Sequence, residues 1–330
     1  MKKKCLITGA TAVLGTAFKN LINENKISSF YDNVDFVFIG SKDCNLINKD
    51  EVYELFKKHN FSYVMHLAAV SGGVGLASAN FQATLFYNNL MMLLNLLEAS
   101  REFKIEKTLL TLSTGMYSPS IEMPYKESSL HKGLAHDGLY GYYYAKRMME
   151  PALRAYRDQY KMNIIGVVPN GIFGENDNFD LQGAPLVPAL IRRFHEAKEK
   201  NSNIEVWGDG SALREWTYSK DMAKAFLWCF ENYNSEKILN VGSTEENSVK
   251  DIAFMIAELI GFDKSNILFD TTKPEGVHKK STDNSEFVNI SSFEYTKFKE
   301  SLKLTIDWFQ DCKKSHPEKL RLYPKTQNEI

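Results

Sequence analysis

A tyrosine and a lysine lie four residues apart in the segment 141–146, as Tyr142 and Lys146. If the segment is helical, both side chains share one face, because residues four positions apart on a helix point in the same direction. An ammonium group beside a tyrosine hydroxyl favours the phenolate and lowers a pKa that ordinarily lies at about 10. The spacing therefore predicts a proton donor that works near neutral pH.

The N-terminal region predicts a scaffold for these side chains. An apolar run over residues 4–8 leads into a turn that contains Gly9 and Gly15, and an amphipathic stretch follows. A strand, a glycine turn and a helix in this order open a dinucleotide-binding βαβ unit. Gly9 permits the tight turn, Gly15 lets the helix pack closely on the strand, and the helix N-terminus offers N–H groups to a pyrophosphate. The predicted cofactor contacts in this unit are Thr8, Gly9, Ala12, Val13, Leu14 and Gly15, with Ala12 in place of the usual middle glycine.

The end of the second apolar run, residues 34–39, bears on the choice of cofactor. NAD sites usually place an acidic residue there to hold the ribose 2′-hydroxyl. Here Gly40 is followed by Ser41 and Lys42, which suit a 2′-phosphate, although Asp43 comes directly after them. We therefore expect NADP as the cofactor, bound in part by Ser41 and Lys42.

Two further apolar runs, over residues 63–69 and 107–114, end in small or hydroxyl side chains. Ligands bind at the carboxyl ends of the strands in open parallel sheets. Ser113 and Thr114 are therefore expected where a carbonyl substrate would meet Tyr142. The remaining predicted cofactor contacts are Leu67, Ala68, Ala69, Asn89 and Pro169.

The alternation of these runs with helical patterns predicts an α/β protein. We expect a Rossmann-type, doubly wound parallel sheet with a smaller mixed α/β substrate domain on its C-terminal side. The predicted division is 1–168, with returning segments near 215–245, for the cofactor domain, 169–312 for the substrate domain and 313–330 for a poorly ordered tail.

Composition excludes several functional classes. A net charge of −1 over 330 residues argues against a dedicated nucleic-acid binder. The four cysteines, at positions 5, 44, 229 and 312, have no metal-site spacing and suggest neither a metal centre nor disulfides. No apolar run approaches the roughly 20 residues needed to span a bilayer, so we expect a soluble, cytoplasmic protein.

The glycine turn, Ser113, and Tyr142 with Lys146 together resemble the extended short-chain dehydrogenase/reductase superfamily. Within it, the chain is similar to the GDP-L-fucose synthase branch, which comprises the GDP-4-keto-6-deoxymannose 3,5-epimerase/4-reductases. The resemblance runs from about residue 3 to 309. Its most distinctive segments are 66–69 with Gly72 and Gly73, 177–179, 187–197, 206–210, 213–215 and 270–276.

The resemblance implies reduction by NADPH of the C4 ketone of a GDP-linked 4-keto-6-deoxy sugar, within surface-glycan precursor synthesis. Tyr142 would give the proton, Ser113 would hold the carbonyl oxygen, and Lys146 would lower the pKa of Tyr142 and grip the nicotinamide ribose. It also implies a homodimer, formed through the predicted helices 79–99 and 142–160. The implied substrate contacts are Ser113, Thr114, Asn178, Arg193, Trp207, Arg214 and Lys280.

The chain departs from the family pattern at two positions that matter for chemistry. The family's epimerisation base is a cysteine two residues after the active-site serine, where this chain has Gly115, and its partner acid is a histidine, where this chain has Pro185. Neither side chain titrates, and deprotonation beside a ketone needs a positioned base. We therefore predict a reductase without epimerase activity, unless His131 or His136 acts as a substitute.

Other readings stay open at this point. Asn170 and Gly171 stand where the family has threonine and asparagine. The side-chain volume removed there would accommodate a larger sugar such as a 6-deoxyheptose. The rival functions are the intact bifunctional enzyme, a 4,6-dehydratase and a non-catalytic NADP-binding regulator. A dehydratase would carry an acidic residue within 114–116, and a regulator would typically lose the tyrosine or the lysine.

Overall fold

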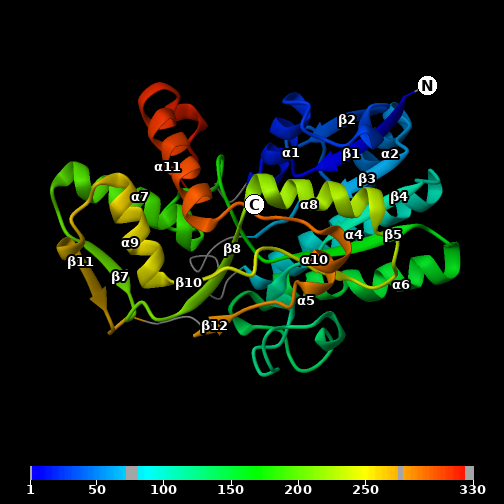
Figure 1. Ribbon diagram of the computed structural model, residues 1–330. Helices are drawn as coiled ribbons and strands as arrows, with labels where there is room; N and C mark the ends of the chain where they lie inside the picture. The colour runs from blue at the N-terminus through cyan, green and yellow to red at the C-terminus, as the bar shows by residue number, and fades with distance from the viewer. Residues whose placement is uncertain (1, 72–80, 274–277, 324–330) are drawn as a thin grey trace.

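The computed structural model describes residues 2–71, 81–273 and 278–323. Its largest element is a six-stranded, all-parallel sheet in the order β2-β1-β3-β4-β5-β9, shown in Figure 1. Strand β1 is second from one edge, with β2 on one side and β3, β4, β5 and β9 on the other, so the sheet winds in two directions from β1, as predicted. The strands are β1 (Lys3–Thr8), β2 (Val34–Ile39), β3 (Tyr63–His66), β4 (Lys107–Thr111), β5 (Ile164–Pro169) and β9 (Leu239–Val241).

Helices cover both faces of this sheet, because alternate side chains of a strand point to opposite faces. In β1, Cys5 and Ile7 face a core that includes Phe18 and Phe226, whereas Leu6 faces a separate core that includes Phe56. The helices around the sheet are α1 (Val13–Asn23), α2 (Lys49–His59), α4 (Gln82–Glu102), α5 (Tyr140–Arg147), α6 (Met149–Tyr160) and α8 (Ser219–Asn232).

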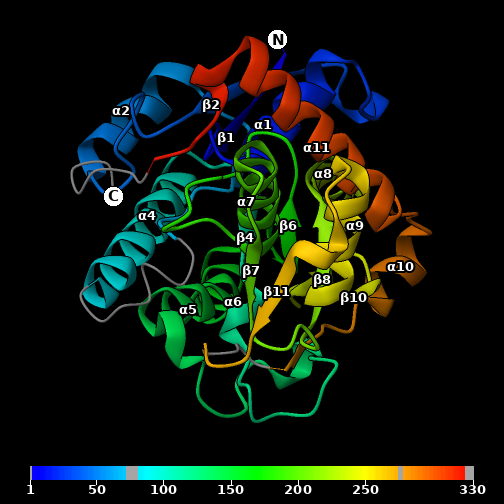
Figure 2. The ribbon, with the colours of Figure 1, turned by 90° about the vertical axis from the view of Figure 1, so that its left-hand side faces the viewer.

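A smaller unit lies beside the carboxyl ends of the large sheet, as Figures 1 and 2 show. Its strand β8 pairs antiparallel with β10 and parallel with β6 and β12, so this sheet has both strand directions. A two-stranded parallel sheet and three helices complete the unit around a second core. The elements are β6 (Gly171–Phe173), β7 (Ile204–Trp207), β8 (Leu213–Tyr218), β10 (Glu246–Ser248), β11 (Ile267–Asp270), β12 (Lys279–Lys280), α7 (Leu186–Lys200), α9 (Val249–Ile260) and α11 (Phe298–Ser315).

The chain crosses between the two units more often than the predicted division allows. Helix α10 (Ser285–Ser291), counted with the substrate domain above, packs through Phe287 into the core of the large sheet. The predicted tail boundary at 312 falls inside α11, and Leu320 beyond it is buried. Both differences have the same cause. Phe287 and Leu320 are apolar, and packing them against a core removes their apolar surface from water.

Several loops of the described chain contain short 3₁₀ helices, and one of these, η2, contains the predicted site residue Thr114. These are η1 (Ser29–Tyr31), η2 (Thr114–Met116), η3 (Glu127–Ser129), η4 (Asp137–Leu139), η5 (Lys264–Asn266) and η6 (Pro317–Lys319). Within the described ranges, no helix is both long and apolar enough to cross a membrane. Over the same ranges, no group of three or more His, Cys, Asp or Glu side chains could hold a metal ion.

Candidate active site

The turn after β1 has the shape that a dinucleotide pyrophosphate needs. Gly9 has a φ of +75°, and a Cβ atom there would lie 2.9 Å from the Ala68 backbone nitrogen. A Cβ atom on Gly15 would overlap the Gly9 carbonyl oxygen. Helix α1 begins after Ala12, whose side chain makes no capping hydrogen bond, so the first-turn N–H groups are left for an anion. The glycine roles inferred from spacing agree with this geometry.

Replacing Gly15 with alanine is expected to weaken NADPH binding at least about tenfold, which corresponds to about 1.4 kcal/mol. The added Cβ atom would push α1 away from the turn that receives the pyrophosphate. Fluorescence titration with NADPH measures the change. Gly183→Ala is the matched control, because the nearest atom to its Cβ would be 3.4 Å away. Equal affinity of the Gly15→Ala variant and the wild type would contradict this role.

Thr8 and Asn89, whose cofactor contacts stay a prediction, use their side chains to fix the backbone around the site. Thr8 Oγ1 accepts hydrogen bonds from the backbone N–H groups of Leu67 and Ala68, each at 3.1 Å. The Asn89 amide accepts from the N–H of Val70 at 3.0 Å and donates to its carbonyl oxygen at 2.9 Å. We therefore assign both residues a positioning role behind the strand ends.

The loop after β2 leaves its polar groups available for a 2′-phosphate. Asp43 Oδ2 accepts the backbone N–H of Gly40 at 2.8 Å, so this carboxylate is committed to the turn. Ser41 and Lys42 are exposed beside it. Asp43 thus stabilises the turn, which leaves the cationic Lys42 for a 2′-phosphate and favours NADP over NAD.

Ser113, Tyr142 and Lys146 come together at the carboxyl end of β4, as predicted. Helix α5 carries both Tyr142 and Lys146, and the Lys146 Nζ lies 5.8 Å from the centre of the Tyr142 ring. The Tyr142 hydroxyl bonds to the side chains of Ser113 and Ser71. Lys146 is almost fully buried and donates to the Thr111 carbonyl oxygen at 2.7 Å.

One electrostatic expectation is wrong for this site. Burial raises the pKa of Tyr142, and the hydrogen bonds from Ser113 and Ser71 only partly offset this effect. Burial also lowers the pKa of Lys146 to about 7, so part of its charge is lost near neutral pH. The reason is desolvation, which penalises the charged form of each group and which spacing alone does not reveal. Tyr142 therefore stays protonated, which suits a proton donor.

Gly115 stands two residues after Ser113, where the family has its cysteine, and the aromatic ring of Tyr143 packs against it. A Cβ atom on Gly115 would overlap Cε1 and Cδ1 of Tyr143. Gly171 is equally closed, since its Cβ atom would lie 2.8 Å from the Glu215 carbonyl oxygen. The spare volume expected beside Asn170 is therefore absent at Gly171, because neighbouring groups occupy it.

Neither candidate substitute for the missing acid/base pair is positioned as a free base. His131 Nε2 pairs with Glu150 at 2.7 Å on an exposed surface. His136 Nδ1 accepts the backbone N–H of Gly138 at 3.0 Å, so the neutral ring carries its proton on Nε2. Pro185, at the position of the family histidine, is the residue that precedes α7.

Four of the predicted substrate contacts lie in the smaller unit as two pairs. Arg214 on β8 and Lys280 on β12 are register partners, and burial, followed by repulsion from Arg214, lowers the pKa of Lys280 to about 8. Arg193 lies 6.0 Å from the centre of the Trp207 ring, which is 48% exposed and thus not a core residue. Guanidinium and indole groups are of the kind that bind phosphates and stack on bases, so the predicted contacts with a nucleotide diphosphate stay a prediction.

The remaining predicted residues have mixed placements. Thr114 is buried in η2, and Pro169 ends β5. Asn178 Oδ1 accepts the backbone N–H of Asp180 at 3.1 Å, and its backbone pairs with Arg321. The segments containing Gly72, Gly73 and 274–276, which contributed to the family resemblance, lie outside the described residues.

Sequence reasoning missed a buried carboxyl group that joins the two units. Glu215 Oε2 accepts from the backbone N–H and the hydroxyl of Thr282, at 3.1 and 3.0 Å, and from Asn170 Nδ2 at 3.4 Å. Asn170 also accepts from the Thr217 hydroxyl at 2.7 Å. Glu215 thus fixes the segment that carries Lys280. Its place in the motif 213–215 was the available signal, but its partners are distant in sequence.

This carboxyl group should make stability depend on pH. Burial raises the pKa of Glu215 to about 7 from 4.5. The folded state therefore binds the proton more tightly, and stability present below pH 4.5 is lost as the pH rises through about 7. Between pH 5 and pH 8 the unfolding free energy of the wild type should fall by about 1–3 kcal/mol relative to Glu215→Gln. Urea denaturation at both pH values measures this, with exposed Glu205→Gln as control. A difference that does not vary with pH would contradict the assignment.

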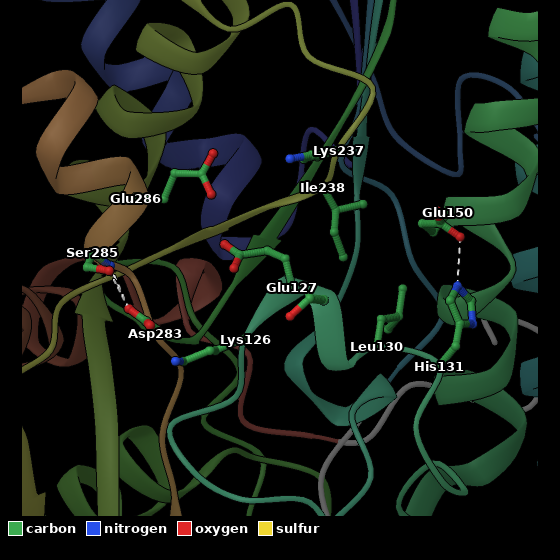
Figure 3. A pocket seen from close by; sticks show the side chains of 11 residues that line it. Lys126, Glu127, Leu130, His131, Glu150, Lys237, Ile238, Asp283, Ser285 and Glu286 are labelled. Atoms are coloured by element: carbon green, nitrogen blue, oxygen red, sulfur yellow. Dashed lines mark hydrogen bonds and ion pairs between the residues drawn. The ribbon is translucent and has the colours of Figure 1, made fainter.

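A separate pocket lies away from these residues. It has a volume of about 440 Å³, and of the residues considered for the site only His131, the candidate substitute base, lines it. Figure 3 shows the carboxyl groups of Glu127, Asp283 and Glu286 around it, with His131 and Glu150 paired at its edge. This pocket is therefore distinct from the candidate active site.

A Rossmann-type sheet with a serine, a tyrosine and a lysine at its strand ends defines the short-chain dehydrogenase/reductase class. The chain belongs to the NAD dependent epimerase/dehydratase family, whose model matches residues 5–242. It is 32% identical over 313 residues to a GDP-L-fucose synthase from Dictyostelium discoideum, covering 94% of this chain and 96% of the relative. These matches place it among oxidoreductases that act on GDP-sugars.

Two solved structures extend the comparison. A GDP-L-fucose synthetase from Naegleria fowleri bound to NADP has a TM-score of 0.88 and 31% identity, covering 97% of this chain and 96% of the other. A GDP-mannoheptose C4 reductase from Campylobacter jejuni with NADP bound has a TM-score of 0.83 and 25% identity, covering 94% and 98%. The similarity therefore spans both units of the fold.

Proposed function

We propose that this protein is an NADPH-dependent C4 reductase of a GDP-linked 4-keto-6-deoxy sugar and lacks 3,5-epimerase activity. The observation that carries the proposal is the Tyr143 ring packed on Gly115, beside an intact arrangement of Ser113 and Tyr142. The groups for proton delivery to a C4 oxygen are present. The position of an epimerisation base holds a glycine covered by an aromatic ring.

Each residue of the site has a separate role in the reduction. Bound NADPH supplies the hydride. Tyr142, kept protonated by burial, donates its proton to the C4 oxygen, and the Ser113 hydroxyl bonds to the same oxygen. Lys146 then stabilises the phenolate that remains. Because both Tyr142 and Lys146 lie on α5, one short helix sets their geometry.

The nucleotide part of the substrate is assigned to the smaller unit. Arg214 and Lys280 bind the diphosphate, and Arg193 with Trp207 binds farther along the nucleotide. GDP is favoured because the similar proteins named above act on GDP-sugars. The name of the Campylobacter reductase supports a heptose, whereas the groups packed against Gly171 weaken the steric argument for one.

The rival proposal is the bifunctional 3,5-epimerase/4-reductase, as the names of the GDP-L-fucose synthase relatives suggest. It needs a base near C3 and C5, and the described part of the site offers His136 in a donor tautomer only. A non-catalytic regulator would bind NADPH without turnover. Product analysis separates these three functions.

A homodimer is part of the proposal. Helices α4 and α5 lie side by side, and they expose Phe86, Tyr87, Leu94 and Tyr140. The predicted second helix is broken at Met148 into α5 and α6. Sedimentation of the wild type tests the dimer. A cytoplasmic place in surface-glycan precursor synthesis rests on the family resemblance alone.

The experiment that tests the proposed function is turnover of a panel of nucleotide-linked 4-keto sugars, hexoses and heptoses, with NADPH or NADH. We expect oxidation of NADPH in preference to NADH and a 4-hydroxy product identified by NMR. The Lys42→Ala variant should reduce the preference for NADPH. Absence of NADPH oxidation with every member of the panel would contradict the proposal.

A further inference from the structure

Tyr143 and Gly115 form one packing unit, although they belong to different elements. Gly115 lies in η2 and Tyr143 in α5. The ring lies so close to the Gly115 Cα atom that any Cβ atom there would overlap it. A Cβ atom at position 115 would therefore require the Tyr143 ring to move.

Three further side chains fix the ring. The Lys280 Nζ lies 5.7 Å from the ring centre, within the range of a cation–π contact. The His136 ring meets it edge-on, with centroids 6.1 Å apart, and the Tyr142 ring lies 5.5 Å away. Tyr143 is thus held between the proton donor and the proposed diphosphate-binding cation.

This placement determines which part of a substrate Tyr143 would meet. In a nucleotide-linked 4-keto sugar, the ketone carbon C4 and the phosphate-bearing carbon C1 lie at opposite sides of one six-membered ring. Tyr142 is the proposed proton donor to the ketone oxygen, and Lys280 is the proposed contact to the phosphate. A side chain packed between these two residues therefore lies beside the sugar ring itself.

We propose that Tyr143 is a specificity-determining residue whose ring bounds the sugar subsite and limits the size of the substituent accepted next to the ketone. The proposal rests on the proposed function. A substituent larger than the subsite must displace the ring, and Gly115, Lys280 and His136 oppose that movement. A single methylene in such a subsite typically changes discrimination by about 10–200-fold.

The first test compares kcat/KM for a GDP-linked 4-keto-6-deoxyhexose and its heptose analogue. Tyr143→Ala should shift the ratio at least about tenfold toward the heptose, whereas Tyr143→Phe, which keeps the ring, should preserve it. NADPH affinity should stay unchanged in both. Tyr160→Ala on α6, an aromatic residue 44% exposed, is the matched control.

The second test moves the ring from the other side. Gly115→Ala should lower kcat/KM for both sugars at least about tenfold by pushing the ring toward the substrate, and adding Tyr143→Ala should recover much of that loss. If Tyr143→Ala alone binds no NADPH, Tyr143→Leu replaces it in both tests. An unchanged sugar ratio in a Tyr143→Ala variant that binds NADPH, or no recovery in the double variant, would overturn the inference. Absence of wild-type turnover with either sugar would instead overturn the proposed function.

Discussion

Replacing Tyr142 with phenylalanine is expected to lower kcat by about 10²–10⁴-fold, the range typical of a lost general acid. The change removes one oxygen and keeps the ring, so the contacts of α5 with its neighbours persist. NADPH binding should change less than about twofold, because the phenol hydroxyl contributes little to the affinity for the dinucleotide. We therefore expect NADPH oxidation to be almost abolished, while the fluorescence titration still shows NADPH binding.

The matched control for this prediction is Tyr160→Phe, which removes an exposed hydroxyl from α6. Its kcat should equal that of the wild type. If Tyr142→Phe retained more than about a tenth of wild-type kcat, another group would deliver the proton. Ser113 would then be the first candidate, because it bonds to the same hydroxyl.

Lys146→Met is expected to lower kcat/KM by about 10²-fold or more, because no cation would stabilise the phenolate left on Tyr142. The wild type should also show a characteristic pH dependence. Burial lowers the pKa of Lys146 to about 7, so the ammonium loses its proton as the pH rises through 7 and the rate should decline above it. The raised pKa of Tyr142 places its own deprotonation at much higher pH.

The Lys146→Arg variant tests whether the decline in rate comes from loss of the positive charge at position 146, because arginine keeps the charge but changes the shape of the side chain. A guanidinium stays charged throughout the measurable range, so the decline above pH 7 should disappear even if the absolute rate is low. A pH profile of kcat/KM from 5.5 to 9.5 measures it. An identical decline in the wild type and in Lys146→Arg would show that another group titrates.

Local signals were sufficient for parts of this fold. Helix α9 runs over Val249–Ile260 as its pattern predicts, because a Ser248–Asp251 capping box begins it and Gly261 in the left-handed conformation ends it. The glycine turn and the order of strands and helices likewise follow from residues that are neighbours in sequence. The fold class is confirmed.

The features that needed the structure all depend on residues far apart in sequence. The packing of Tyr143 on Gly115 joins a strand-end loop to a helix that begins 25 positions after Gly115 (140 minus 115). The pKa values of Tyr142 and Lys146 depend on burial by several elements. Thr8 and Asn89 are predicted cofactor contacts by position, and only the structure shows that their side chains also bond to the backbone after β3.

The central claim, reduction without epimerisation, is tested most directly by running the reaction in D₂O with NADPH and reading the product by NMR. Hydrogen at C3 and C5 exchanges with solvent only if a base removes it. Tyr142→Phe and an enzyme-free sample serve as controls, since an epimerisation base would still act in the former. We predict a 4-hydroxy product with no deuterium at C3 or C5 above the enzyme-free level. Deuterium at either carbon in the presence of the wild type or Tyr142→Phe would contradict the account.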